Sequence, residues 1–204
     1  MQRPLAGKET MLDHLQRYHI ILASNSPRRR ELLAGLGIPF EVRVLPDISE
    51  SYPDELPVAE TAQYIACEKA AAYQQMMGAD DLVIAADTVV ICAQEVLGKP
   101  VDADDARRML RLLSGKTHQV ITGVCLTTRE RQRAFSVQTD VTFKMLSDEE
   151  IDYYVSTYQP MDKAGAYGIQ EWIGYIGVMS LHGSYFNVMG LPVQRIYEEL
   201  RTSF

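Results

Sequence analysis

The hydrophobic positions divide the chain into short apolar runs separated by amphipathic stretches. Residues 19–23 (HIILA) predict a strand, and the stretch after them predicts a helix from Pro27 to about Leu36. Ser26 is a good N-cap, and proline suits the first helical position. The two glycines at the other end supply the stop. This part of the chain therefore reads as strand, short polar turn and helix.

Later segments show both strand and helix periodicity. The run Leu82–Cys92 is almost wholly apolar, which is typical of a strand buried on both faces. Thr117–Thr128 and Phe135–Lys144 predict paired antiparallel strands joined by a charged turn. Ser147 and Glu150 form a capping-box signature for a helix that reaches about residue 158. These segments predict that helices and strands belong to one fold.

The remaining elements complete the prediction. They are an extended segment at Phe40–Leu45, a long helix at Val58–Met77, a helix capped by Asp102 that reaches Leu113, short strands near Ile173–Met179 and Tyr185–Val188, and a helix from about Pro192. Helices that alternate with mixed strands predict an α/β fold, with a three-layer arrangement of helices around a mixed sheet. Residues 1–18 are predicted to be a loosely attached extension, helical over Lys8–Arg17, that precedes a single domain at 19–204.

Composition restricts the class of protein. The 204 residues are 47% hydrophobic, enough for one sizeable core, and the formal net charge of −7 argues against a broad nucleic-acid-binding surface. Three widely spaced cysteines in apolar stretches predict buried reduced thiols rather than a disulfide framework or a zinc site. The first eighteen residues lack a secretory h-region, and no apolar run approaches the roughly 20 residues that span a bilayer. We therefore expect a cytoplasmic protein without a membrane partner.

The densest basic cluster lies at an unfavourable place. Arg28, Arg29 and Arg30 occupy the first turn of the predicted helix, where the helix dipole favours anions. A bound phosphate between the arginines and the helix end would remove this conflict, because helix N-termini and guanidinium groups both bind phosphate. A solvated basic turn is the alternative. The small polar residues at 24–26 favour the phosphate site.

A single carboxylate interrupts the most apolar strand. Asp87 lies in VIAADTVVI, and a carboxylate is costly to bury there unless it is paired or binds a metal. Thr88 points to the opposite face of a regular strand, so both side chains would reach one ligand only at a strand end or bulge. Lys69, Lys99 and Glu50 are each as compatible with a solvated surface as with this site.

Six segments together carry a resemblance to a known family. LASNSPRRRELL, EKA, AADTVV, LGKP, SGKTHQVITGV and DKAGAYGIQ occur in this order from about residue 21 to 200. This series resembles the Maf family of nucleoside triphosphate pyrophosphatases, and DKAGAYGIQ with GSYFNVMGLP resembles the branch that acts on dTTP and UTP. The resemblance implies two lobes with a cleft, as in the Maf/ITPase-like folds, and it allows a homodimer.

The resemblance also implies roles for individual residues. The segment that grips the triphosphate in the family corresponds to Ser24, Ser26, Arg28 and Arg29, and Arg30 lies beyond it at the expected surface. The proton acceptor corresponds to Asp87, the two motif lysines to Lys69 and Lys99, and the glutamate of metal binding and catalysis to Glu50. Positions linked to substrate choice correspond to Arg28, Thr88 and Gln170.

These roles predict metal-assisted hydrolysis. Asp87 and Glu50, with Mg²⁺ or Mn²⁺, would activate a water for attack on the α-phosphorus, and the cations would stabilise the departing pyrophosphate. Two other classes stay open at this point. One is a nucleotide-binding regulator of cell division or septum formation without significant turnover, and the other is a module that binds nucleic-acid ends through the same arginines.

Overall fold

Three long antiparallel strands form the centre of a seven-stranded sheet in the computed structural model, which describes residues 11–46 and 48–204. The strand order is β2-β1-β3-β5-β6-β7, with β4 paired to β3. β1 is parallel to both β2 and β3, whereas the other pairs are antiparallel, so the predicted mixed sheet is confirmed. The strands are β1 (His19–Leu22), β2 (Glu41–Val42), β3 (Asp81–Cys92), β4 (Glu95–Leu97), β5 (Thr117–Thr127), β6 (Gln132–Phe143) and β7 (Val178–His182).

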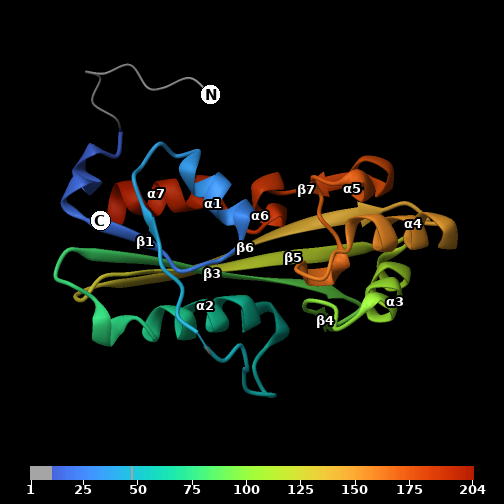
Figure 1. Ribbon diagram of the computed structural model, residues 1–204, viewed down its shortest axis with the longest axis horizontal. Coiled ribbons are helices and arrows are strands. Elements are labelled where there is room, and N and C mark those ends of the chain that lie inside the picture. Colours follow the sequence, from blue (N-terminus) through green and yellow to red (C-terminus); the bar gives the residue numbers. More distant parts are fainter. Residues whose placement is uncertain (1–10, 47) are drawn as a thin grey trace.

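Helices cover both faces of this sheet. Figure 1 shows α2 along one face and α1, α6 and α7 on the other, which confirms the predicted three layers. The α-helices are α1 (Pro27–Ala34), α2 (Thr61–Ala71), α3 (Ala103–Leu113), α4 (Asp148–Tyr158), α5 (Trp172–Gly177), α6 (Tyr185–Met189) and α7 (Val193–Ser203). The 3₁₀ helices are η1 (Asp13–Arg17), η2 (Val58–Glu60), η3 (Gln74–Met76) and η4 (Ala164–Ala166).

Two hydrophobic clusters divide the molecule into lobes. One contains Leu33 of α1 and Leu200 of α7, and the other contains Leu110 of α3 and Tyr154 of α4. The long strands β3, β5 and β6 pass through both clusters, so they join the lobes. Between the clusters the strands carry polar residues, and the hydroxyls of Thr88 and Thr122 lie 2.9 Å apart there. This polar belt is where a cavity opens between the two lobes.

The predicted helix caps form as the sequence indicates. The Ser26 hydroxyl accepts a hydrogen bond from the Arg29 amide at 3.4 Å, and Asp102 caps α3 in the same way. Ser147 and Glu150 form both halves of a capping box at the start of α4. The predicted hairpin of β5 and β6 is also confirmed.

Two predicted strands are wrong in whole or in part. Tyr185–Val188 lies in a helix, α6, because the Ser184 hydroxyl caps it and the Asn187 side-chain amide donates to the carbonyl of Val120. Ile173–Met179 is mostly helix α5, and only its end joins β7. Aromatic and β-branched residues favour strands, but packing decides the structure of such short segments.

Other boundaries also differ from the prediction. The long helix predicted at Val58–Met77 is divided into η2, α2 and η3, because Tyr73 turns inward and donates its hydroxyl to the Arg43 carbonyl at 2.6 Å. The segment Phe40–Leu45 contributes only the two residues of β2. The three cysteines are free, as predicted, but Cys67 is only half-buried.

The segment before β1 is attached to the core. Leu12 and Leu15 are buried, and the Arg17 guanidinium donates to the carbonyl of Phe204. A loose attachment is therefore wrong for residues 11–18. Of the predicted helix Lys8–Arg17, the structure shows a 3₁₀ helix at its end, and residues 8–10 lie outside the described part. Within that part, no helix has both the length and the hydropathy to cross a membrane.

Candidate active site

One cavity of about 450 Å³ lies between the lobes and brings together every residue that the sequence assigned to the site. Its walls come from the β1–α1 turn, the loop before α2, the middle of β3 and the segment around η4. The predicted residues that line it are Ser24, Ser26, Arg28, Arg29, Glu50, Lys69, Asp87, Thr88, Lys99 and Gln170.

An open stretch of β3 lets the cavity reach both faces of the sheet. β1 runs beside β3 only as far as Ile84, where the Ala23 amide donates to the carbonyl, and β4 begins to pair at Val90. Asp87 and Thr88 lie between these two points. Their pairing with β5 is regular, so both side chains border one cavity without the strand end or bulge that the sequence reasoning thought necessary. The open edge explains how side chains on opposite faces border one cavity.

Asp87 is paired with a lysine rather than isolated. The Lys69 ammonium lies 2.7 Å from a carboxylate oxygen of Asp87 and 2.8 Å from one of Glu50. The side chains of Lys69 and Asp87 are each only 13% exposed, whereas that of Glu50 is 49% exposed. Lys99 lies further away, 3.8 Å from the other Glu50 oxygen. The shared ammonium therefore compensates the carboxylate in the apolar strand.

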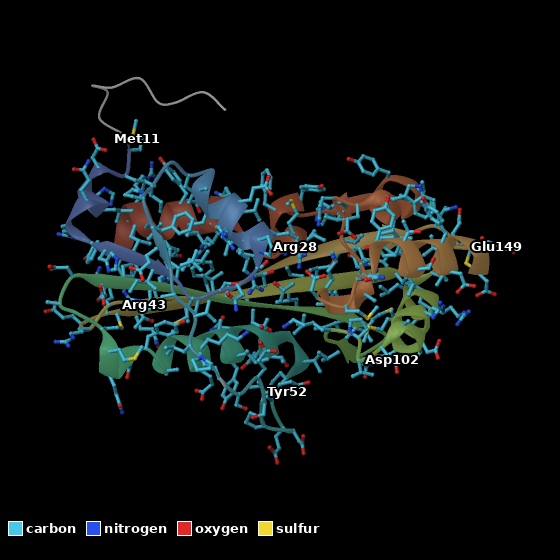
Figure 2. The ribbon with its side chains drawn as sticks, in the orientation of Figure 1. Met11, Arg28, Arg43, Tyr52, Asp102 and Glu149 are labelled. Carbon is cyan, nitrogen blue, oxygen red and sulfur yellow. The ribbon has the colours of Figure 1, made fainter. Side chains whose placement is uncertain are left out.

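Glu50 reaches this pair from a loop. Figure 2 shows the loop that carries Tyr52 projecting on the α2 side of the sheet, and Glu50 lies two residues before this tyrosine. Burial acts to raise the pKa of Glu50, but the hydrogen bond from Lys69 and the charge of Lys99 lower it overall. Glu50 is thus held as a carboxylate beside Asp87.

A glycine on the neighbouring strand allows this contact. Gly123 of β5 is paired with Asp87, and a Cβ atom on it would lie 2.3 Å from backbone atoms of Ala62 and Gln63 in α2. The missing side chain lets the backbone of α2 lie directly on the sheet. This close approach brings Lys69 of the same helix within reach of Asp87.

Arg29 is fixed to the protein by most of its donors. Its Nε donates to the Gly190 carbonyl at 2.8 Å, and its terminal nitrogens donate to the Ala86 carbonyl at 2.8 Å and the Thr88 hydroxyl at 3.0 Å. A longer contact of 3.5 Å reaches the Ser24 hydroxyl. Burial lowers the pKa of Arg29. The guanidinium braces the open edge of β3 on both sides of Asp87.

Arg28 is held more loosely. Figure 2 shows it near the centre of the molecule, on the side of the sheet that carries α1. Its guanidinium donates to a carboxylate oxygen of Asp162 at 2.8 Å, and the side chain of Asp162 is 57% exposed. Arg30 is exposed, as predicted. The two arginines of the motif therefore differ in how readily they can turn to a ligand.

The sequence reasoning missed two charged residues of the cavity. Asp162 holds Arg28, and the buried Lys163 pairs with Asp162 at 2.7 Å and with Glu171 at 3.1 Å. Burial acts to raise the pKa of Asp162, but Lys163 and Arg28 lower it to about 2. The available signal was Lys163 directly before an apolar, glycine-rich stretch, because a lysine beside buried residues needs a carboxylate partner and Asp162 is adjacent to it.

The cavity attracts anions although the chain is acidic. Five basic and three acidic side chains line it, while the chain as a whole carries a formal charge of −7. The basic residues are Arg28, Arg29, Lys69, Lys99 and Lys163, and the acidic ones are Glu50, Asp87 and Asp162. Several of these cations already contact carboxylates, so an arriving anion would replace those carboxylates as the partner of the cations.

A divalent cation would be held at this site by protein carboxylates only together with phosphate oxygens of a bound substrate. The Asp87 and Glu50 carboxylates approach one nitrogen, so their oxygens lie close to each other. Among residues 11–46 and 48–204 no cluster of three or more histidine, cysteine or acidic side chains forms a metal site. Mg²⁺ is commonly held by one or two carboxylates together with substrate phosphates. Two carboxylates next to an anion-binding cavity match that pattern.

The mixed sheet, the two lobes and the basic cavity are those of an α/β protein that binds an anionic ligand. Residues 19–203 match the family model described as Maf-like protein, and the chain belongs to this family. It is 66% identical over 191 residues to the dTTP/UTP pyrophosphatase of Phocaeicola vulgatus, which covers 94% of this chain and 99% of the relative. It is 60% identical to the dTTP/UTP pyrophosphatase of Bacteroides thetaiotaomicron, with the same coverage.

Solved structures show only a partial likeness. A nucleoside-triphosphatase, dITP/XTP pyrophosphatase, from Mycobacterium abscessus is 17% identical, with a TM-score of 0.40 over 63% of this chain and 75% of that one. No functional conclusion follows from so distant a match.

Proposed function

We propose that the protein hydrolyses dTTP and UTP to the nucleoside monophosphate and pyrophosphate. The observation that carries the proposal is the cluster of Lys69, Asp87 and Glu50 at the open edge of β3, inside a cavity with more basic than acidic side chains. The names of the relatives at 60–66% identity support the same reaction and the same substrates.

The bound triphosphate brings about three to four negative charges, which the cations of the cavity offset. An ammonium has three donors, and the two carboxylates use two of those of Lys69, so one remains for a phosphate oxygen. Arg28 and Lys99 are the more exposed cations and turn from their carboxylates to the outer phosphates. Their charge stabilises the pyrophosphate as it leaves.

Asp87 is the base in this proposal. It orients a water and accepts its proton while the water oxygen bonds to the α-phosphorus and the bond to the bridging oxygen of the β-phosphate breaks. Asp87 and Glu50 would hold Mg²⁺ or Mn²⁺, which lowers the pKa of bound water and neutralises phosphate charge when it is bound. Arg29 keeps the strand around Asp87 in place and adds positive charge from the far side.

Gln170 would read the base. Uracil and thymine present an acceptor–donor–acceptor edge, and a carboxamide satisfies both a ring N–H and a carbonyl. Cytosine would leave one of these buried groups without a partner, at a cost of roughly 1–3 kcal/mol. Thr88 and Arg28 are the other positions that we assign to substrate choice.

The test is release of pyrophosphate from a panel of nucleoside triphosphates with Mg²⁺, Mn²⁺ or EDTA. We expect turnover of dTTP and UTP with metal and none with EDTA. We also expect Asp87→Asn to bind nucleotide while its turnover falls at least about 100-fold, since general-base catalysis contributes that much. Turnover by Asp87→Asn near the parent rate would contradict the role of Asp87, and binding without turnover by the parent protein would favour the regulator instead.

Several expectations from the sequence stay predictions within this proposal. They are a single catalytic domain at 19–204 after an N-terminal extension, a location in the cytoplasm, a homodimer, and the absence of nucleic-acid and membrane partners. Light scattering of the purified protein tests the dimer, and titration with a labelled oligonucleotide at low salt tests binding to nucleic acid.

A further inference from the structure

The turn that carries Gln170 is closed by a buried tyrosine. The Glu171 amide donates to the Gly168 carbonyl at 3.0 Å, so residues 168–171 form a turn with Gln170 in its second half. The Gly168 amide donates to the hydroxyl of Tyr154 at 3.0 Å, and that hydroxyl donates to the Glu171 carboxylate. A single oxygen atom therefore holds both ends of the turn.

This tyrosine is itself fixed. Tyr154 is fully buried in α4, and its ring stacks on Tyr158 at 5.1 Å between centroids. Burial and the bond to Glu171 raise the pKa of Tyr154, so its hydroxyl stays protonated and acts as the donor. The hydroxyl can bond to Glu171 and Gly168 at once because it is both a donor and an acceptor.

A buried lysine balances the charge of this group. Lys163 lies 3.1 Å from Glu171 and 2.7 Å from Asp162, and Asp162 in turn holds Arg28. The chain of contacts runs from the phosphate side of the cavity to the base side. Without Lys163, the Glu171 carboxylate would be a poorly compensated charge next to the turn.

The amide of Gln170 also has little freedom within the turn. A Cβ atom on Gly168 would lie 2.9 Å from the Gln170 side-chain nitrogen, so the amide folds closely over the glycine backbone. Movement of Gly168 would therefore move the carboxamide that faces the cavity.

We infer that Tyr154, Glu171 and Lys163 are positioning residues that determine pyrimidine selectivity by fixing the turn that presents Gln170. The inference rests on the proposed function, because it assumes that Gln170 reads the base of a bound pyrimidine nucleotide. A carboxamide discriminates between uracil and cytosine only if its oxygen and nitrogen keep one orientation, and these three residues supply that restraint.

The test compares the binding of three probes by calorimetry with Mg²⁺: the α,β-imido analogues of UTP and CTP, which are not cleaved at the α-phosphorus, and inorganic tripolyphosphate, which has no base. Tyr154→Phe removes the one oxygen that holds the turn. Tyr158→Phe is the matched control, because it removes a hydroxyl from the stacked neighbour without touching the turn. Glu171→Gln is the second variant, since it keeps a side-chain acceptor for Tyr154 but loses the charge facing Lys163.

We expect Tyr154→Phe to lower the preference for the UTP analogue over the CTP analogue by about tenfold, with the affinity for tripolyphosphate within about twofold of the parent value. Glu171→Gln should lower the preference in the same direction by a smaller factor, and Tyr158→Phe should leave both quantities unchanged. An unchanged preference in both turn variants overturns the inference. So does a proportional loss of tripolyphosphate binding, or a parent protein that binds both analogues equally. Failure of the proposed function is seen separately, as absence of pyrophosphate release.

Discussion

Replacing Arg29 by lysine tests whether this arginine braces the catalytic strand. The substitution keeps the positive charge but replaces a planar fork of donors by a single nitrogen. In the structure the fork joins two segments: it reaches the Ala86 carbonyl and the Thr88 hydroxyl in β3, and the Gly190 carbonyl after α6. An ammonium can reach one or two of these acceptors, so at least one buried carbonyl loses its partner.

The expected loss of stability follows from these contacts. A hydrogen bond to a charged group contributes roughly 1.5–3 kcal/mol, and partial replacement by water reduces the net loss for Arg29→Lys to about 2–4 kcal/mol. For a chain of this length that corresponds to a decrease in Tm of roughly 4–16 °C. Catalysis should fall as well, because a displacement of Asp87 by about 1 Å can reduce kcat about 100-fold.

Arg28→Lys is the matched control for this experiment. It is the same substitution one residue earlier, but Arg28 pairs with an exposed carboxylate, and such pairs contribute about 0–1 kcal/mol. We expect its Tm to change by no more than about 4 °C. Its main effect should be a higher KM, because it contributes to phosphate binding rather than to the position of Asp87.

The assays are thermal unfolding and steady-state release of pyrophosphate, applied to both variants. The reasoning is refuted if Arg29→Lys unfolds at the same temperature as Arg28→Lys and keeps the parent kcat. A higher KM alone would show that Arg29 is a phosphate ligand, as the family resemblance implies, and not a brace.

Two further predictions concern residues outside the phosphate contacts. Gly123→Ala should lower the free energy of unfolding in urea by more than about 1–3 kcal/mol, because the added Cβ would lie 2.3 Å from the α2 backbone. Gly98→Ala is the control: a Cβ there would meet open space, so this variant should be nearly neutral. His118 is buried, and burial lowers its pKa to about 4, so the unfolded chain binds a proton that the folded one excludes. Neutral His118 therefore adds roughly 3 kcal/mol to the free energy of unfolding above about pH 6.5, and this contribution is lost as the pH falls toward 4. The free energy of unfolding of His118→Phe should depend less on pH in this window, and an identical slope would contradict the assignment.

Much of the fold could be predicted because local and tertiary preferences agree. Ser26, Asp102 and Ser147 cap helices in the sequence and in the structure alike. The segment at Tyr185–Val188 shows where such agreement ends. Its composition favours a strand, but a hydroxyl cap and a buried asparagine that bonds to a neighbouring strand make it a helix. The sequence does not show which distant carbonyl will need a partner.

The site could be predicted as a set of residues but not as a set of pairs. The motifs place Asp87, Lys69 and Glu50 in one site, and the structure places them within hydrogen-bond distance of one nitrogen. The partner of Arg28 could not be predicted, because Asp162 follows it by 134 residues and nothing local connects them. The strand at Asp87 and Thr88 was predicted, but its open edge could not be, since that edge depends on where β1 ends and β4 begins.

The exposure of each carboxylate indicates which ion pairs a triphosphate can break. Asp162, with a side chain 57% exposed, can return to water when Arg28 turns to phosphate, and Glu50, 49% exposed, can release Lys99 while its contact with Lys69 stays. Asp87 is only 13% exposed, so its separation from Lys69 would leave a carboxylate among apolar neighbours at a high cost. Substrate binding should therefore exchange the outer pairs and keep the inner one. The carboxylate that stays in place is the one next to the α-phosphorus in the proposed reaction, and the lysine that stays with it can bind the same phosphate. Burial thus separates Asp87, which acts as the base, from Asp162, which only occupies Arg28 until the substrate arrives, while Glu50 stays beside Asp87 where the two would hold the metal ion.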